Sequence, residues 1–325
     1  MIDSNLNNEK IKMERKMGKK YDVICIGMAL IDSIIKGFDP EPISASGFRA
    51  ESGTLNVGGE AVNEAVAASK LGMRTAILCS LGDDAAGDMI VQYLEKFGVD
   101  TSPVIRDKEH ATPVTTMFVN ADGTRKSITN TAHRYNFHPE RFIDIIKDAR
   151  AIILGSLFRA PFDDPDIIQQ VISEAKKAGT IVFADTKLPN FRKLGLNDIK
   201  DALKDTDFIT PNEDEAKYFT QKEKPEEMAD VLLGYGVKNA VIKLGSKGCY
   251  LKNEKMELRI PALKINAVDA TGAGDNLVAG LAAEILNGTG LKEALVFANA
   301  CGAICTTAVG AGTALIDRNQ VLEFI

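Results

Sequence analysis

The sequence predicts an α/β fold built on a mainly parallel sheet that helices cover on both faces. Two observations support this prediction: apolar strand-like runs alternate with helical segments, and several of the helical segments close on a glycine. Apolar runs without polar interruption are typical of parallel strands buried on both faces, and glycine is a common residue after a helix. A third observation, two extended stretches without a helical period, predicts a small additional sheet.

The elements of the main domain follow one another in a regular order. Strands are expected at 21–27, 75–80, 151–154, 180–184, 208–210 and 240–244. Helices are expected at 61–71, 89–97 and 167–177, closed by Gly72, Gly98 and Gly179, with further helices between the later strands. Residues 1–20 are polar with scattered charge and lack the apolar segment of a secretory signal, so we expect a flexible leader outside the fold.

The two extended stretches are 33–57 and 112–130, and the second reads as a hairpin around Ala121-Asp-Gly-Thr124. Ligands of parallel sheets bind at the carboxyl ends of the strands, so a sheet inserted there would form a lid. The main domain would then comprise residues 21–32, 58–111 and 131–325. The alternative is a pair of surface hairpins with no functional role.

Composition excludes several classes of function. The net charge of −6 over 325 residues gives no basic surface for nucleic acid, and no apolar run is long enough to span a membrane. The five cysteines are odd in number and include no C-x-x-C pair, which predicts buried thiols in a reducing compartment, the cytoplasm.

The most informative motif is Asp269-Ala-Thr-Gly-Ala-Gly-Asp275, which leads directly into an amphipathic helix. Gly272, Ala273 and Gly274 carry almost no side chain, so their amides at the helix N-terminus can approach and bind a phosphate. A carboxylate at Asp275 is unfavourable beside an anion unless it has a chemical role. Removing the proton from a hydroxyl that attacks a phosphoryl group is such a role.

Two other interpretations of this motif stay open. Asp275 could simply complement the helix dipole, as acidic residues in first turns often do. Gly272-x-Gly274 also resembles half of a dinucleotide-binding G-x-G-x-x-G motif, which would indicate an oxidoreductase. Against the second interpretation, Leu277 occupies the position of the third glycine and the motif lies near the end of the chain.

Four further segments supply candidate binding residues, each with a structural alternative. Asp32 follows the first strand and could accept sugar hydroxyls or cap a turn, and Gly58-Gly59 and Asn63 begin the first long helix. Asn212 and Glu215 join a strand to a helix, where they could cap the helix or act near Mg²⁺ and phosphate. The Lys243-Leu-Gly-Ser-Lys-Gly248 segment could contact a nucleotide or form a plain hairpin turn.

In this order along the chain, the segments resemble the ribokinase-like (PfkB) carbohydrate kinase family. The resemblance covers about residues 20–325, and its most specific parts are GGEAVNEAVAASKLG (58–72) and DATGAGDNLVAGL (269–281). It implies a three-layer α/β/α domain with a β-sheet lid, and ATP- and Mg²⁺-dependent phosphorylation of a sugar. A homodimer formed through the lid is also implied. A nucleoside kinase of the same family and a non-catalytic sugar-sensing module remain alternatives.

The resemblance also implies roles for individual residues. Asp275 would be the general base, and the amides of Gly272, Ala273 and Gly274 the anion hole. Asp32, Gly58, Gly59 and Asn63 would contact the sugar; Asn212, Lys243, Gly245, Gly248 and Asn299 the nucleotide; Glu215 would act on Mg²⁺ through water, and Asp269, Thr271 and Gly310 on a monovalent cation such as K⁺.

Three positions depart from the ribokinase pattern and argue against ribose as the substrate. Leu30, Glu60 and Leu157 stand where ribokinases have polar or basic residues. Glu60 is expected to repel a carboxylate and so to disfavour a sugar acid. Arg134 and Arg159 would favour an anionic substrate if they face the site, because guanidinium groups bind planar anions.

Overall fold

The computed structural model describes residues 18–37, 50–120, 124–130 and 137–325. Its central sheet consists of β1 (Tyr21–Ile26), β4 (Thr75–Leu78), β9 (Ala149–Leu157), β10 (Ile181–Thr186), β11 (Phe208–Ile209), β12 (Asn239–Lys243), β13 (Cys249–Lys252) and β14 (Glu257–Ile260). The strand order is β14-β13-β12-β11-β10-β9-β1-β4. Pairs from β12 to β4 are parallel, and only β13 and β14 are added antiparallel at one edge. The predicted mainly parallel sheet is confirmed.

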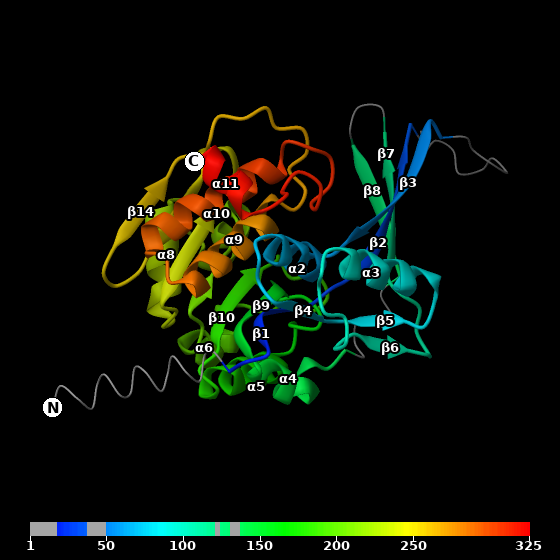
Figure 1. Ribbon diagram of the computed structural model, residues 1–325. Coiled ribbons are helices and arrows are strands. Elements are labelled where there is room, and N and C mark those ends of the chain that lie inside the picture. Colours follow the sequence, from blue (N-terminus) through cyan, green and yellow to red (C-terminus); the bar gives the residue numbers. More distant parts are fainter. Residues whose placement is uncertain (1–17, 38–49, 121–123, 131–136) are drawn as a thin grey trace.

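Helices cover both faces of this sheet, as Figure 1 shows. One face carries α2 (Glu60–Lys70), α3 (Ala85–Lys96), α9 (Ala273–Asn287), α10 (Leu291–Cys305) and α11 (Arg318–Phe324). The other carries α4 (Ile143–Lys147), α5 (Pro165–Lys177), α6 (Lys200–Lys204), α7 (Glu213–Thr220) and α8 (Pro225–Gly234). Single 3₁₀ turns occur at Pro139–Phe142, Leu196–Ile199 and Gly245–Lys247.

Strand β1 shows why the chain forms three layers. Its side chains alternate between the two faces of the sheet, and all of its apolar ones are buried. Val23 and Cys25 pack in the core beneath α2 and α9, whereas Ile24 and Ile26 pack in the core beneath α5. A strand whose apolar residues point to both faces of the sheet therefore requires a helical layer on each side.

Two elements begin or end beyond the residues predicted from sequence. Helix α3 starts at Ala85 instead of residue 89, because the Asp84 side chain accepts a 2.8 Å hydrogen bond from the Gly87 amide and caps an extra turn. Strand β9 continues to Leu157 instead of stopping at residue 154, because its last residues still pair with β10.

A second sheet contains β2 (Leu30–Lys36), β3 (Ser52–Gly58), β7 (Val114–Val119) and β8 (Arg125–Thr129), in the order β3-β2-β7-β8. Figure 1 shows it projecting from the α/β body beside α2 and α3. The sheet begins three residues before the predicted insertion 33–57, because Leu30, Ile31 and Asp32 already pair with β3. Asp32 thus lies within a strand of this sheet and not in a loop after β1. A short parallel pair joins β5 (Ser80–Gly82) to β6 (Ile105–Asp107).

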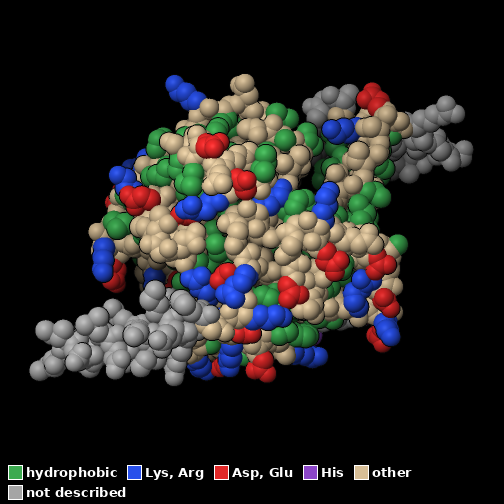
Figure 2. Space-filling model, in the orientation of Figure 1, with side chains coloured by type: hydrophobic (Ala, Val, Ile, Leu, Met, Phe, Trp, Pro, Cys, Tyr) green, Lys and Arg blue, Asp and Glu red, His purple; other side chains and the backbone are tan. Residues whose placement is uncertain are grey.

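The surface and the thiols agree with the composition. On the face shown in Figure 2, acidic and basic side chains are interspersed. None of the helices within the described residues is long and apolar enough to cross a membrane. All five cysteines are buried and unpaired, as predicted. The cytoplasmic location stays a prediction.

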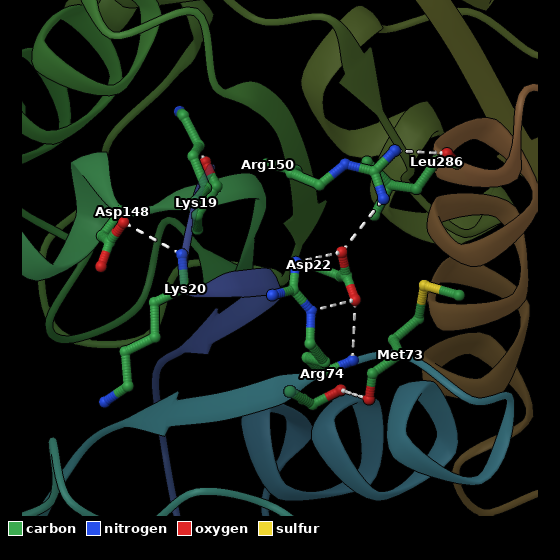
Figure 3. Close-up of polar contacts among 10 residues, drawn as sticks. Lys19, Lys20, Asp22, Met73, Arg74, Asp148, Arg150 and Leu286 are labelled. Atoms are coloured by element: carbon green, nitrogen blue, oxygen red, sulfur yellow. Dashed lines mark hydrogen bonds and ion pairs between the residues drawn. The ribbon is translucent and has the colours of Figure 1, made fainter. Parts of the chain in front are cut away.

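A cluster of charged side chains links the amino ends of three neighbouring strands, β1, β4 and β9 (Figure 3). The Asp22 carboxylate accepts hydrogen bonds from the Arg74 amide and guanidinium and from Arg150, each at 3.0 Å. Arg150 also donates to the Leu286 carbonyl at the end of α9. Burial acts to raise the pKa of Asp22, but the bonds from Arg74 and Arg150 lower it to about 2. The cluster therefore joins β1, β4 and β9 to one helical layer.

We expect Asp22→Asn to lower the free energy of unfolding by about 2 kcal/mol at pH 7, because it weakens charge-assisted bonds. Since the pKa of Asp22 is depressed in the folded state, its contribution is present above pH 4 and is lost as the pH falls toward 2. Urea unfolding of both proteins between pH 7 and pH 2.5 measures this. The Asp144→Asn variant is the control and should show no comparable pH-dependent difference, because Asp144 is exposed.

Candidate active site

A cavity of about 690 Å³ lies where the carboxyl ends of β9, β10 and β12 meet the first turns of α2 and α9 and the inner face of the small sheet. Twelve of the predicted site residues line it: Asp32, Gly59, Asn63, Asn212, Glu215, Lys243, Gly245, Thr271, Gly272, Ala273, Gly274 and Asp275. The cavity thus gathers residues from five separate parts of the chain. Their convergence follows from the parallel sheet, which places successive strand ends at one edge.

Asp275 lies in the first turn of α9 and faces this cavity. The helix begins after Gly272, whose φ of 78° is left-handed and whose α carbon lies so close to Ala311 that a β carbon there would be 2.1 Å from the Ala311 methyl. The Asp275 side chain is nearly buried and accepts a 2.7 Å hydrogen bond from Asn63 Nδ2 in α2. Both predicted residues therefore meet at one point of the cavity.

The surroundings of Asp275 raise its pKa to about 6. Burial is the main cause, and the charge of Glu60 adds to it. Lys187 and the hydrogen bond from Asn63 act in the opposite direction. A carboxylate with such a pKa is ionised at neutral pH and still basic enough to accept a proton, which suits a general base.

Glu60 forms an ion pair with Lys187, with 3.3 Å between Oε1 and Nζ, and both residues line the cavity. Lys187 follows the end of β10, so the pair connects α2 to the central sheet. Burial acts to raise the pKa of Glu60, but Lys187 holds it below its usual value. Lys187 offsets part of the Glu60 charge, but Glu60 still raises the pKa of Asp32 and Asp275, so the expectation that Glu60 repels an anion stays a prediction.

A second buried ion pair joins Lys243 to Asp185, which also accepts a hydrogen bond of 2.7 Å from Thr210. A β carbon built on Gly274 would lie 3.2 Å from Lys243 Nζ, so the ammonium group sits beside the amide turn that precedes Asp275. Burial acts to lower the pKa of Lys243, but Asp185 and Glu215 raise it overall. Lys243 is therefore a charged group next to the candidate anion hole.

Asn212 and Glu215 form a reciprocal cap at the start of α7. Asn212 Oδ1 accepts from the Glu215 amide, and Glu215 Oε2 accepts from the Asn212 amide, both at 2.9 Å. Glu215 Oε2 also accepts from Thr186 at 2.9 Å. Burial raises the pKa of Glu215. The capping interpretation of this motif holds, and because both side chains line the cavity the capping bonds also fix them there.

Five predicted site residues lie outside the cavity lining: Gly58, Gly248, Asp269, Asn299 and Gly310. Gly58 makes room for Asp32, whose Oδ2 would be 2.6 Å from a β carbon at that position. Gly248 has φ 91° and a β carbon there would meet the Ile260 carbonyl at 2.0 Å, so it serves the turn. Asn299 donates to the Pro261 carbonyl at 2.9 Å. Their roles in binding stay predictions.

Asp269 lies outside the cavity lining and accepts hydrogen bonds from the turn that precedes α9. Its Oδ1 accepts from the Thr271 amide and hydroxyl, and its Oδ2 accepts from the Gly310 amide at 3.0 Å. These bonds tie the turn before α9 to the loop around residue 310. The monovalent-cation site predicted for this loop stays a prediction.

Three charged residues were missed from the sequence: Asp185, Lys187 and Glu64. Asp185 and Lys187 lie within three residues of the end of the predicted strand 180–184. Ligand-binding residues of a parallel sheet are expected at such strand ends, so this position could have identified both. Glu64 lies in the middle of the alanine-rich helix α2. Its side chain is fully buried, neither oxygen has a hydrogen-bond partner among the described residues, and burial followed by the charges of Asp185 and Asp275 raises its pKa well above normal. Burial therefore favours the neutral acid over the carboxylate at Glu64.

Comparison with known proteins decides the family. The model of the pfkB family carbohydrate kinases matches residues 20–318. The chain belongs to the pfkB family of carbohydrate kinases. The match confirms the kinase interpretation over the oxidoreductase alternative. This kinase therefore belongs to the phosphotransferases that use an alcohol group as acceptor and ATP as donor.

Individual relatives agree with this assignment. The kinase is 32% identical over 314 residues to a probable fructokinase-5 of Arabidopsis thaliana, covering 90% of this chain and 94% of the relative. It superimposes on the Arabidopsis thaliana ribokinase complexed with ribose and ATP with a TM-score of 0.82 at 26% identity, covering 94% and 98% of the chains. A putative ribokinase II from E. coli, in complex with ATP and Mg²⁺, gives a TM-score of 0.75 at 25% identity over 93% and 98%.

Proposed function

We propose that this kinase transfers the γ-phosphoryl group of ATP to a sugar hydroxyl, with Asp275 as the general base. The new bond joins the hydroxyl oxygen to the γ-phosphorus, the bond to the bridging oxygen of ADP breaks, and Asp275 takes the hydroxyl proton. The observation that carries this proposal is the position of Asp275, ionised at neutral pH and directly beside the Gly272–Gly274 amides. Those amides and Lys243 would stabilise the charge on the transferred group.

The sugar half of the cavity is formed by α2 and the small sheet. Asp32, Thr115 and Thr129 are paired across neighbouring strands, so their side chains share one face, and all three line the cavity. With Asn63 they offer acceptors and donors of the kind that hydroxyl groups need. The Arabidopsis relatives, a probable fructokinase and a ribokinase bound to ribose and ATP, support a sugar as substrate.

Mg²⁺ fits the opposite half of the cavity. No group of three acidic, histidine or cysteine side chains suited to a metal occurs within the described residues. Mg²⁺ is commonly held by one carboxylate, waters and substrate phosphates, and Glu215 can supply that carboxylate at a fixed position. When bound, the ion would offset phosphate charge. The E. coli protein in complex with ATP and Mg²⁺ supports binding of this ion together with ATP. A second ion, K⁺ near Asp269, is proposed from the sequence motif.

The outer face of the small sheet supports a homodimer. Leu55, Ser33, Thr116 and Ile128 are paired in one row across β3, β2, β7 and β8, on the face opposite Asp32. Leu55 is 60% exposed and Ile128 71% exposed. Two large apolar side chains in one exposed row of a sheet favour burial against another chain, which agrees with a dimer formed through the lid.

We expect Asp275→Asn to lower kcat by about 10²- to 10⁴-fold, because the amide cannot accept the hydroxyl proton. ADP formation in a coupled assay over a panel of sugars measures this. Unchanged thermal stabilisation by ATP–Mg²⁺ would show that the fold and the nucleotide site are intact. Full activity of the variant would contradict the role of Asp275.

The Glu60–Lys187 pair should control the pH dependence of the reaction. Asp275 must be ionised to act, so kcat/KM should rise as the pH increases through about 6. Lys187→Met removes a charge that lowers the pKa of Asp275 and should shift this limb to higher pH. Glu60→Gln removes a charge that raises it and should shift the limb to lower pH. Two shifts in the same direction would contradict the electrostatic assignment.

The dimer can be tested by introducing charge on the outer face of the small sheet. Leu55→Asp and Ile128→Asp, separately and together, should convert the dimer to a monomer in light scattering, because burying an unpaired carboxylate is unfavourable. Ile316→Asp is the matched control, since Ile316 is 65% exposed elsewhere on the molecule. A wild-type protein that is monomeric at every concentration tested would overturn the proposal.

A further inference from the structure

Arg159 lies at the wall of the cavity on a turn with unusual backbone geometry. The turn follows β9, and Ser156 and Phe158 both have left-handed φ angles, 66° and 77°, although neither is glycine. Such conformations are strained and persist where the surrounding structure holds them, which is common at functional sites. Here the Arg159 amide donates to the Ser156 carbonyl, and the Phe162 amide donates to the Arg159 carbonyl.

Packing makes this turn rigid. Phe158 is fully buried and stacks on Phe219 with 4.2 Å between ring centroids. The Arg159 Nε donates a 2.7 Å hydrogen bond to the Leu188 carbonyl, which fixes the direction of the guanidinium group. Its two terminal nitrogens form no hydrogen bond or ion pair with any residue that the structure describes. The fold thus holds the Arg159 side chain in place, and the N–H groups of its two terminal nitrogens can bind a ligand.

The charges around Arg159 leave a place for an anion. Lys187 pairs with Glu60 and offsets part of its charge, which lessens the repulsion that Glu60 would exert on an anion. Asp32 is the other carboxylate on the sugar side, and burial and the charge of Glu60 raise its pKa. Asp32 belongs to the small sheet, whereas Arg159 belongs to the turn after β9, so the two approach the cavity from different walls.

We propose that the sugar substrate carries an anionic group, a carboxylate or a phosphate, and that Arg159 binds it. This inference rests on the proposed kinase function and narrows its substrate class. A guanidinium held by its Nε presents two parallel N–H donors, the geometry that matches two oxygens of either anion. Asp32 and Asn63 would bind hydroxyls of the same molecule, which leaves one of its hydroxyls for Asp275.

The test compares neutral and anionic forms of the same sugars. Glucose, gluconate and glucose 6-phosphate form one series, and fructose and fructose 6-phosphate a second, each with saturating ATP–Mg²⁺. We expect one anionic compound to exceed its neutral parent in kcat/KM by about 10- to 100-fold, the range of a charge-assisted bidentate contact. The acid and phosphate arms separate the two sources of the anion.

Variants identify the residue responsible. Arg159→Met should remove the preference for the anionic compound, chiefly through KM, and leave the neutral sugars unchanged, while Arg159→Lys should restore part of it. Arg192→Met is the matched control, because Arg192 pairs with Asp164 and does not line the cavity. Equal losses for neutral and anionic sugars would mean a purely structural role for Arg159 and overturn the inference.

Binding distinguishes failure of this inference from failure of the proposed function. Calorimetric titration of the same compounds into the wild-type kinase with a non-hydrolysable ATP analogue and Mg²⁺ needs no turnover. Tighter binding of a neutral sugar than of every anionic form would overturn the inference while the kinase assignment stands. Tight binding of an anionic sugar without ADP formation would instead count against the roles given to Asp275 and the anion hole.

Discussion

The hydrogen bond from Asn63 to Asp275 joins the first turns of two helices that lie 212 residues apart in the chain. It depends on the parallel sheet, because only a sheet whose strands end at one edge places α2 and α9 side by side above that edge. The left-handed Gly272 then directs the amide turn toward the same point. The proposed base, anion hole and sugar-binding helix thus share one position, which phosphoryl transfer requires because most of its catalysis is positioning.

Two ion pairs stabilise buried charges that line the cavity. Six acidic side chains lie in or beneath it, and two lysines, Lys187 and Lys243, come from the ends of β10 and β12 to offset Glu60 and Asp185. Glu64 has no hydrogen-bond partner among the described residues, and burial raises its pKa. The balance leaves Asp275 ionised at neutral pH but still basic, and it leaves Arg159 as a cation whose terminal donors are unpaired among the described residues. The same pairing underlies both the proposed chemistry and the proposed choice of substrate.

Sequence patterns predicted much of this arrangement, and their errors share a cause. The hairpin at 112–130 and the glycine turn at Asp275 were predicted correctly because local chemistry defines them: alternating extended runs in one case, small residues before a helix in the other. Asp32 was expected after β1 and lies inside the small sheet, because strand pairing with β3 decided its position. Asn212 and Glu215 form the cap that a cautious interpretation expects, and the same bonds hold both side chains in the cavity.

The sequence by itself indicated the family, the α/β class and the candidate base, since short-range patterns carry these. Tertiary structure alone decided the charge relations. Glu60 in α2 meets Lys187 after β10, 127 positions further along the chain, and that pairing offsets part of the charge that Glu60 presents to a substrate. No local pattern predicts such a contact, because it arises from the packing of a helix over a sheet. Arg159 likewise became informative only when a rigid turn placed it in the cavity.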